Sequence, residues 1–262
     1  MPDAGAASTP RPFHPATGAW LPQAPPAPPV APDEARKGPL AVAANILLGL
    51  DLAILGLFAV LSLVVAIAQA LAGTSPTTGP LDGQAILLNA LVTFVLMGVI
   101  PVAWLLATRR KSVVGTLAYL RLHTPARSLL KGTGLGLAAI AAIVLLGLLL
   151  DRLGWMPTNP VADELAKAMT LRLALVLSLT AAVGEEILFR GVLQRWVGVW
   201  GQAALFALAH IGYGTVLQLV IPGLLGLGFG LLVKRGASLW VVIAAHFVFD
   251  FVQLASAVLV PG

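Results

Sequence analysis

The chain has 262 residues, of which 58% are hydrophobic and only 10% are charged. The surface of a soluble domain needs more polar cover than this, so the composition predicts an all-α, polytopic helical membrane protein in contact with a lipid bilayer. The absence of cysteine excludes disulfides, thiolate metal ligands and a cysteine nucleophile. The net charge of +5 reflects basic residues beside apolar segments, where they set topology, and we expect no nucleic-acid partner.

The first 38 residues form a separate compositional zone. Proline recurs throughout residues 2–32, interleaved with Ala, Thr and Gly, and no apolar segment there could form a core or a signal peptide. We therefore expect residues 1–38 to be a disordered cytoplasmic tail. Residues 39–160 are expected to hold three membrane spans with their connectors, and residues 161–262 a helical core that carries the motifs described below.

Apolar segments follow the tail in close succession. We expect about seven transmembrane helices, over residues 40–71, 85–107, 132–150, 160–196, 202–211, 216–233 and 239–259. Pro101 is expected to kink the second helix, and glycines at the start of the third are expected to allow close helix packing. Lysine and arginine gather in the connectors that share a side with the N-terminus, which predicts a cytoplasmic N-terminus and an external C-terminus. The composition, rich in Ala, Gly, Val and Pro, suggests a bacterial plasma-membrane protein.

Asp51 interrupts the first apolar segment. A carboxylate at membrane depth is costly and needs an explanation. It could hold a side chain of the functional site in position. Alternatively, it could be paired or hydrated near the inner interface, because it lies only a few turns from Arg36 and Lys37.

Residues 184–191 (GEEILFRG) place charged side chains where the composition predicts hydrocarbon. Ionisable groups inside a membrane segment are rare, so Glu185, Glu186 and Arg190 mark a candidate functional site. Glu186 and Arg190 are four residues apart and are expected to form an ion pair along one helix face. For this pair alone, a structural role is the better interpretation.

Two histidines stand in similar settings further along the chain. Phe206 precedes His210 by about one helical turn, and His246 precedes Asp250 by the same spacing, so each pair shares a helix face. At 1.5 Å per residue from the inner interface, Glu185 and His210 lie at a depth of roughly 15 Å, and His246 at roughly 12 Å. The three helices are therefore expected to carry these side chains to a common level in the membrane.

These side chains suit hydrolysis of a peptide bond by an activated water. Glu185 could act as general base toward the water and then donate a proton to the leaving amine, with His210 sharing the proton transfer. His246 could stabilise the developing oxyanion, and Asp250 could orient its imidazole. A buried network with only a structural role is the alternative. No His-Glu-x-x-His or Gly-x-Ser-x-Gly pattern points to another protease design.

Three patterns thus occur in order on successive apolar segments: Glu185-Glu186-x-x-x-Arg190, Phe206-x-x-x-His210 and His246-x-x-x-Asp250. Together they resemble the motifs of the CPBP family, also called the ABI family, which comprises type II CAAX prenyl endopeptidases and bacteriocin-processing or immunity relatives. The resemblance covers about residues 165–260. It implies an intramembrane endopeptidase with a conical helical core that opens toward the cytosol.

The resemblance also implies roles for single residues. Glu185 would activate the water with His210 as its partner, and His246 with Asp250 would form the oxyanion-stabilising pair. Glu186, Arg190 and Phe206 would be supporting residues. Asp250 stands at a position that the family fills with Asn or Asp, and an ionised Asp can only accept hydrogen bonds, so orienting His246 is its more plausible task.

A metal ion is a further question, because the family is often labelled a metalloprotease. If one divalent ion such as Zn²⁺ is bound, Glu185, His210 and His246 are its candidate ligands. No two of these three residues share a helix face, and we favour a glutamate-activated water without a cofactor.

Three classes of function are therefore compared. The leading hypothesis is an endopeptidase that acts on a membrane-associated peptide or protein. A non-catalytic immunity or regulatory protein on the same scaffold is the second, and a proton-coupled transporter is the third. A transporter is expected to show corresponding broken helices in two halves, whereas the ionisable residues of the three motifs gather in the C-terminal half.

Overall fold

The structure, a computed structural model, describes residues 13–14, 19–20, 38–74, 80–108, 112–122, 125–213 and 215–259. The chain divides into two units, Met1–Glu34 and Ala35–Gly262. In the first unit, β1 (Phe13–His14) pairs with β2 (Ala19–Trp20) in antiparallel orientation. The rest of the proline-rich segment, for which we expect a disordered tail, lies outside the described residues.

The described elements of the second unit are all helical, and the predicted all-α class is confirmed. They are α1 (Pro39–Ala72), α2 (Gly83–Phe94), η1 (Val95–Val99), α3 (Ile100–Thr108), α4 (Val113–Tyr119), α5 (Pro125–Arg152), α6 (Pro160–Ala168), α7 (Leu171–Glu186), η2 (Ile187–Leu193), α8 (Gln194–Ala209), η3 (Ile211–Tyr213), α9 (Leu217–Lys234) and α10 (Leu239–Leu259). Of the short elements, η1 and η2 are π-helical and η3 is a 3₁₀ turn.

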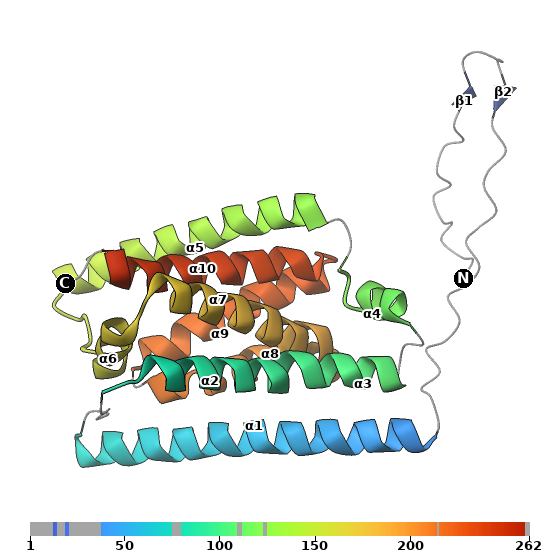
Figure 1. Ribbon diagram of the computed structural model, residues 1–262. Coiled ribbons are helices and arrows are strands. Elements are labelled where there is room, and N and C mark those ends of the chain that lie inside the picture. The colour runs from blue at the N-terminus through green and yellow to red at the C-terminus, as the bar shows by residue number, and fades with distance from the viewer. Residues whose placement is uncertain are drawn as a thin grey trace, which may run out of the picture. The chain divides into compact units, whose positions relative to one another are not determined.

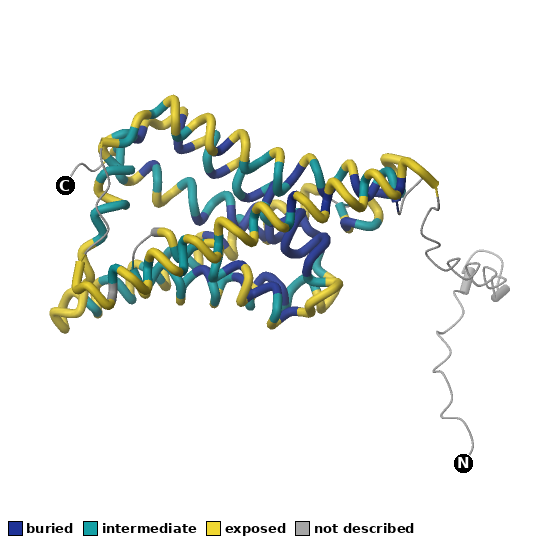
Figure 2. The backbone as a smooth tube through the Cα atoms, turned by 90° about the horizontal axis from the view of Figure 1, so that it is seen from below, coloured by how far each residue is buried: buried dark blue, intermediate teal, exposed yellow. Residues whose placement is uncertain are grey.

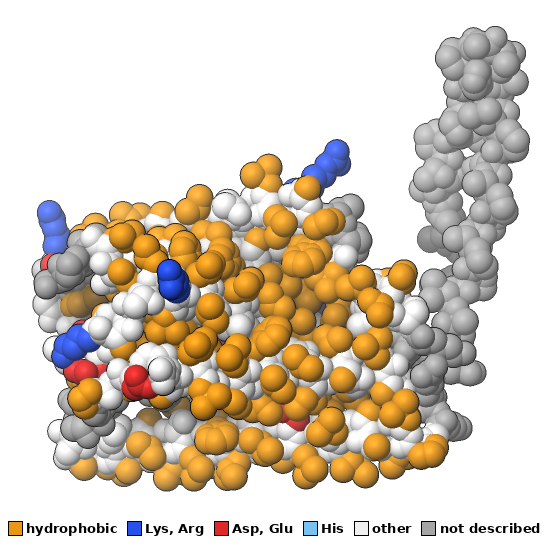
Figure 3. All heavy atoms as spheres, viewed as in Figure 1, with side chains coloured by type: hydrophobic (Ala, Val, Ile, Leu, Met, Phe, Trp, Pro, Cys, Tyr) orange, Lys and Arg blue, Asp and Glu red, His pale blue; other side chains and the backbone are white. Residues whose placement is uncertain are grey.

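The helices of this unit pack in a defined order. The helix α10 contacts both α5 and α7, α7 also contacts α2, α3 contacts α1, and α8 packs against α9 (Figure 1). Buried residues lie on the inward sides of the helices, while outward sides are exposed (Figure 2). The exposed large side chains are mostly Leu, Val and Ile, and hydrophobic side chains cover most of the face seen in Figure 3. An apolar exterior of this extent fits hydrocarbon rather than water as the surrounding solvent.

The number of membrane spans is smaller than the seven expected. Within the described residues, five single segments are long and apolar enough to cross a membrane, namely Pro39–Gln69, Gly83–Thr108, Pro125–Arg152, Leu217–Lys234 and Leu239–Leu259. A sixth crossing results if α6 and the following helix, Leu171–Ala209, count as one span bent by 120°.

The bend divides the single helix that we expect over residues 160–196. Met169 is extended, and Thr170 caps α7 by accepting a hydrogen bond from the backbone N–H of Leu173. A threonine just before an apolar run is an N-cap signal, so the new helix starts where the hydrocarbon begins. The preceding helix α6 carries an ion pair between Glu164 and Lys167, which keeps it at the polar edge.

The chain reverses at Gly198. This residue interrupts α8 with a φ of 72°, a conformation that glycine adopts without steric cost. The residues after Gly198 lead back to His210, which lies beside Glu185 of α7. The helical residues after Gly198 extend only about 16 Å along the helix axis, roughly half the thickness of the hydrocarbon core. The short helix expected over 202–211 therefore does not span the membrane.

Two π-helical turns contact each other in the core. The first, η1, directly precedes α3, in which Pro101 lacks an N–H and crowds the preceding turn. The kink expected at Pro101 therefore takes the form of a widened turn within one continuous span. The second, η2, begins directly after Glu185 and Glu186. Such turns are frequent at functional sites.

A glycine seam joins α5 to α10. A Cβ atom added at Gly132 would lie 2.3 Å from the carbonyl oxygen of Val241, and one added at Gly136 would lie 2.7 Å from that of Ala245. Only glycine permits backbones to approach this closely. The close packing predicted for the start of the third span is therefore confirmed at these two positions, and it fixes α10 around His246.

The seam predicts a large effect at one glycine and a small one at its neighbour. We expect Gly136→Leu to lower the free energy of unfolding by at least about 1–3 kcal/mol, because the new side chain overlaps α10. Gly134→Leu serves as the matched control, because Gly134 has open space around it and the variant should stay within about 0.5 kcal/mol of the wild type. Thermal unfolding in detergent micelles measures both, and equal stability of the two variants would contradict the seam.

Candidate active site

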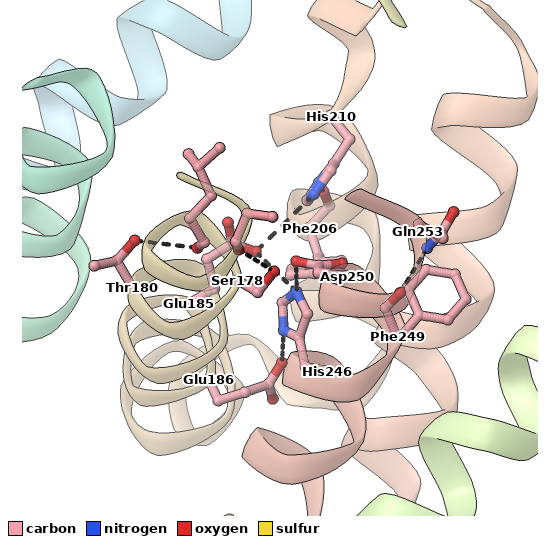
Figure 4. A network of polar contacts seen from close by, with 12 residues as sticks. Ser178, Thr180, Glu185, Glu186, Phe206, His210, His246, Phe249, Asp250 and Gln253 are labelled. Atoms are coloured by element: carbon pink, nitrogen blue, oxygen red, sulfur yellow. Dashed lines mark hydrogen bonds and ion pairs between the residues drawn. The ribbon is translucent and has the colours of Figure 1, made fainter. Parts of the chain in front are cut away.

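The side chains of three helices meet in one cluster (Figure 4). Glu185 comes from the end of α7, His210 from the end of α8, and His246 and Asp250 from α10. Glu185 Oε2 lies 4.0 Å from His210 Nε2 and 3.9 Å from His246 Nε2. His246 Nε2 also lies 3.3 Å from Asp250 Oδ2. The structure thus brings together the four residues that sequence analysis proposes for chemistry.

Glu186 connects this cluster to a buried cation. Its Oε1 accepts a hydrogen bond from Arg190 Nη1 at 2.8 Å and lies 2.9 Å from His246 Nδ1. Both side chains of the Glu186–Arg190 pair are fully buried, and the predicted ion pair is confirmed. Glu186 therefore does more than hold its own helix, because it also sets the orientation of the His246 ring.

Aromatic rings surround the Arg190 guanidinium. Its central carbon lies 4.3 Å from the ring centroid of Phe206, 5.5 Å from that of Phe229 and 6.0 Å from that of Phe189. The electron-rich faces of aromatic rings attract a cation and partly replace its hydration. Phe206 also contacts His210, with ring centroids 4.7 Å apart. Phe206, the supporting residue of the second motif, thus contacts both the buried Arg190 guanidinium and the His210 ring.

The hydrogen bonds at Nδ1 orient the two histidines differently. His210 Nδ1 lies 2.8 Å from the carbonyl oxygen of Phe206, so it donates there and leaves Nε2 as an acceptor directed toward Glu185. In His246 both ring nitrogens face carboxylate oxygens, those of Glu186 and Asp250. Carboxylates only accept hydrogen bonds, so a doubly protonated ring satisfies both contacts and can present Nε2–H as a donor.

Exposure falls from one side of the cluster to the other. The side chains of Asp250, His210 and Glu185 are 27%, 20% and 14% exposed, whereas those of Glu186 and Arg190 are not exposed. A substrate could therefore reach the cluster from the side of Asp250 and His210. The Glu186–Arg190 pair forms its closed base.

Sequence reasoning missed two contributors to this cluster. Phe229 reaches Arg190 from α9, and its ring centroid lies 6.3 Å from that of His246. Its only sequence signal is its place between two glycines at small-residue spacing, Gly226 and Gly230. The contact between Glu186 and His246 was also missed, because the two residues are 60 positions apart.

Asp51 is buried on α1, at 2% exposure. Neither of its carboxylate oxygens has a hydrogen-bond partner within the described residues. The sequence leaves two interpretations of Asp51 open. For the one in which its carboxylate is paired near the inner interface, the described residues show no partner.

The described residues contain no group of three or more His, Cys, Asp or Glu side chains arranged to hold a metal ion. The candidate ligands Glu185, His210 and His246 do direct one oxygen and two Nε2 atoms toward each other, but at separations of 3.9 and 4.0 Å.

Fold and cluster define a polytopic α-helical membrane protein with a buried carboxylate–histidine site. Residues 167–252 match the family model for type II CAAX prenyl endopeptidase, Rce1-like, and this span contains the whole cluster. The chain is therefore similar to this peptidase family over about a third of its length, in the segment that carries the three motifs.

One relative shares a shorter segment. The uncharacterized protein YpbD of Bacillus subtilis (strain 168) is 36% identical over 77 residues, a match that covers 29% of this chain and 41% of YpbD. The match thus spans less than half of that relative. No solved structure matches the chain.

Proposed function

We propose that the protein is an intramembrane endopeptidase that hydrolyses a peptide bond of a membrane-associated peptide or protein with a water activated by Glu185. The observation that carries this proposal is the position of Glu185 Oε2. This buried atom has no hydrogen-bond partner in the described structure and lies about equally far from two histidine Nε2 atoms. Polar atoms about 4 Å apart are well placed to share one bridging water.

The geometry supports a sequence of proton transfers. Glu185 takes a proton from the water as the water oxygen attacks the scissile carbonyl carbon. His210 Nε2, an acceptor, holds the other hydrogen of the same water and so fixes its direction of attack. The C–N bond then breaks, and the Glu185 carboxyl returns its proton to the leaving amine.

His246 is the proposed donor to the oxyanion. Its Nε2–H points to the side of the cluster where Asp250 lies, which is the side from which the substrate would enter. Glu186 holds the ring through Nδ1. A donor that is already oriented stabilises the developing charge without reorganisation during the reaction. In the resting site Asp250 accepts from Nε2, and we propose that it yields this donor to the oxyanion when substrate binds.

The proposal includes an orientation in the membrane. Basic residues gather at one end of the helical unit, where Arg121 donates to the carbonyl oxygen of Val233 and Arg195 donates to that of Tyr119. We call this the basic end, defined by Arg121, Arg127, Lys131, Arg195, Lys234 and Arg235. Because positively charged connectors stay in the cytoplasm, the basic end would face the cytosol and the C-terminus the outside.

The test compares the host strain that produces the wild-type protein with one that produces Glu185→Ala. New peptide N-termini in the membrane proteome are identified by mass spectrometry. We expect cleavage products that depend on Glu185, and Glu164→Ala, which removes an acid at the exposed ion pair of α6, should leave them unchanged. Identical products from wild type and Glu185→Ala would reject the protease and favour a non-catalytic protein on the same scaffold.

The purified wild-type protein and His210→Ala are analysed for metal in the same experiment. We expect substoichiometric zinc in both and products that persist in the presence of a chelator. Stoichiometric zinc that is lost in His210→Ala would overturn the metal-free scheme, because it would make the site a three-ligand zinc centre.

A further inference from the structure

A cavity at the basic end is not used by the proposed chemistry. It has a volume of about 230 Å³ and lies between the end of α4, the end of η2 and the junction of α9 with α10. Three cationic side chains line it, and no carboxylate of the described residues does. They are Arg121, Arg195 and Lys234. A cavity with one sign of charge concentrates ions of the opposite sign.

The cations that line the cavity suit one kind of anion. Phosphate oxygens are well suited to the forked donors of arginine, and Arg121 and Arg195 bring such donors to the cavity.

The surroundings of the cavity indicate where such a phosphate would come from. Lys234 ends α9, and Arg195 lies three residues before the reversal at Gly198. Beside them, Trp196 and Trp200 are 48% and 75% exposed. Exposed tryptophans beside basic residues are typical of the headgroup level of a bilayer.

Arg121 is held in place for this task. It has a φ of 53°, which is uncommon outside glycine, and its guanidinium donates to the carbonyl oxygen of Val233 while its own carbonyl accepts from Ser238. Arg195 is fixed in the same way, because it donates to the Tyr119 carbonyl oxygen and stacks on the Tyr119 ring at 3.6 Å. Both arginines are therefore preorganised rather than free to turn into solvent.

We propose that this cavity binds the phosphate of an anionic phospholipid headgroup, with Arg121, Arg195 and Lys234 as the cations that hold it. This site is distinct from the peptide-cleaving cluster.

The test measures binding of phosphatidylglycerol, phosphatidylcholine and inorganic phosphate to the detergent-purified full-length protein by native mass spectrometry. We expect phosphatidylglycerol to bind more tightly than zwitterionic phosphatidylcholine. The double variant Arg195→Gln/Lys234→Gln should bind it about 30-fold more weakly, because each cation near an anionic lipid contributes a factor of about five. The matched control Arg172→Gln/Arg235→Gln removes the same charge from exposed residues outside the cavity and should bind about as the wild type does.

The outcomes separate the sources of the phosphate. Equal affinity of the two double variants for phosphatidylglycerol, or equal binding of both lipids to the wild type, would overturn the proposal. Binding of inorganic phosphate that depends on Arg195 and Lys234, without such dependence for the lipid, would assign the cavity to a soluble anion and overturn the lipid. The single variant Lys234→Gln, at an exposed position, preserves the test if the Arg195 variant does not fold; it should bind phosphatidylglycerol about five-fold more weakly.

Discussion

Replacing Glu185 by glutamine is expected to lower the rate of peptide cleavage about 10²- to 10⁴-fold. The amide keeps the size of the side chain but can neither take a proton from water nor return one to the leaving amine. Glu185 Oε2 has no hydrogen-bond partner in the described structure, so folding should change little. Initial rates with the protein in liposomes, together with thermal unfolding, measure the two effects separately.

The control for this prediction is Glu164→Gln, which removes an acid at the exposed ion pair with Lys167. It should retain the wild-type rate. A Glu185→Gln protein that cleaves at more than about a tenth of the wild-type rate would exclude Glu185 as the general base, because general acid–base catalysis contributes at least about 10²-fold.

Breaking the Glu186–Arg190 pair is expected to have the largest effect on stability. Glu186→Leu leaves a guanidinium in a buried position beside aromatic rings and without its carboxylate partner, which should cost about 3–5 kcal/mol. The double variant Glu186→Leu/Arg190→Met should recover much of this loss, because it removes the unpaired charge as well. Thermal unfolding in detergent micelles compares the three proteins.

The exposed pair of α6 provides the comparison. Lys167 is 70% exposed, and Glu164→Leu should cost at most about 1 kcal/mol, as for other exposed ion pairs. If the double variant is no more stable than Glu186→Leu, the lost stability does not come from an unpaired Arg190. The contact of Glu186 with His246 would then be the stabilising one.

The position of the candidate site was accessible from the sequence because membrane helices have a regular rise. Counting residues from the basic and aromatic boundaries places Glu185, His210 and His246 at similar depths. The i,i+4 spacing likewise predicts the Glu186–Arg190 pair, which depends on one helix only. Local periodicity and the cost of intramembrane charge were sufficient for both inferences.

Features that depend on packing between distant segments were not accessible in this way. The contact between Glu186 and His246, and the approach of Phe229 to Arg190, depend on how α7, α9 and α10 rotate about their axes. Hydrophobic periodicity does not define this rotation when nearly every face is apolar. The break before Thr170 does leave a local signal, an N-cap residue ahead of an apolar run. Asn159, however, supplies a helix start eleven residues earlier and so favours one continuous helix.

The glycine seam has a consequence for how this protein can be divided. The matched family segment, residues 167–252, carries every ionisable residue of the site, yet α10 is seated on Gly132 and Gly136 of α5, outside that segment. A fragment limited to the matched residues would expose this side of α10 to lipid and lose the contact that sets its rotation. The unit of homology is therefore smaller than the unit that must fold together. Shortened or chimeric forms of the protein need to retain α5 with the motif-bearing helices.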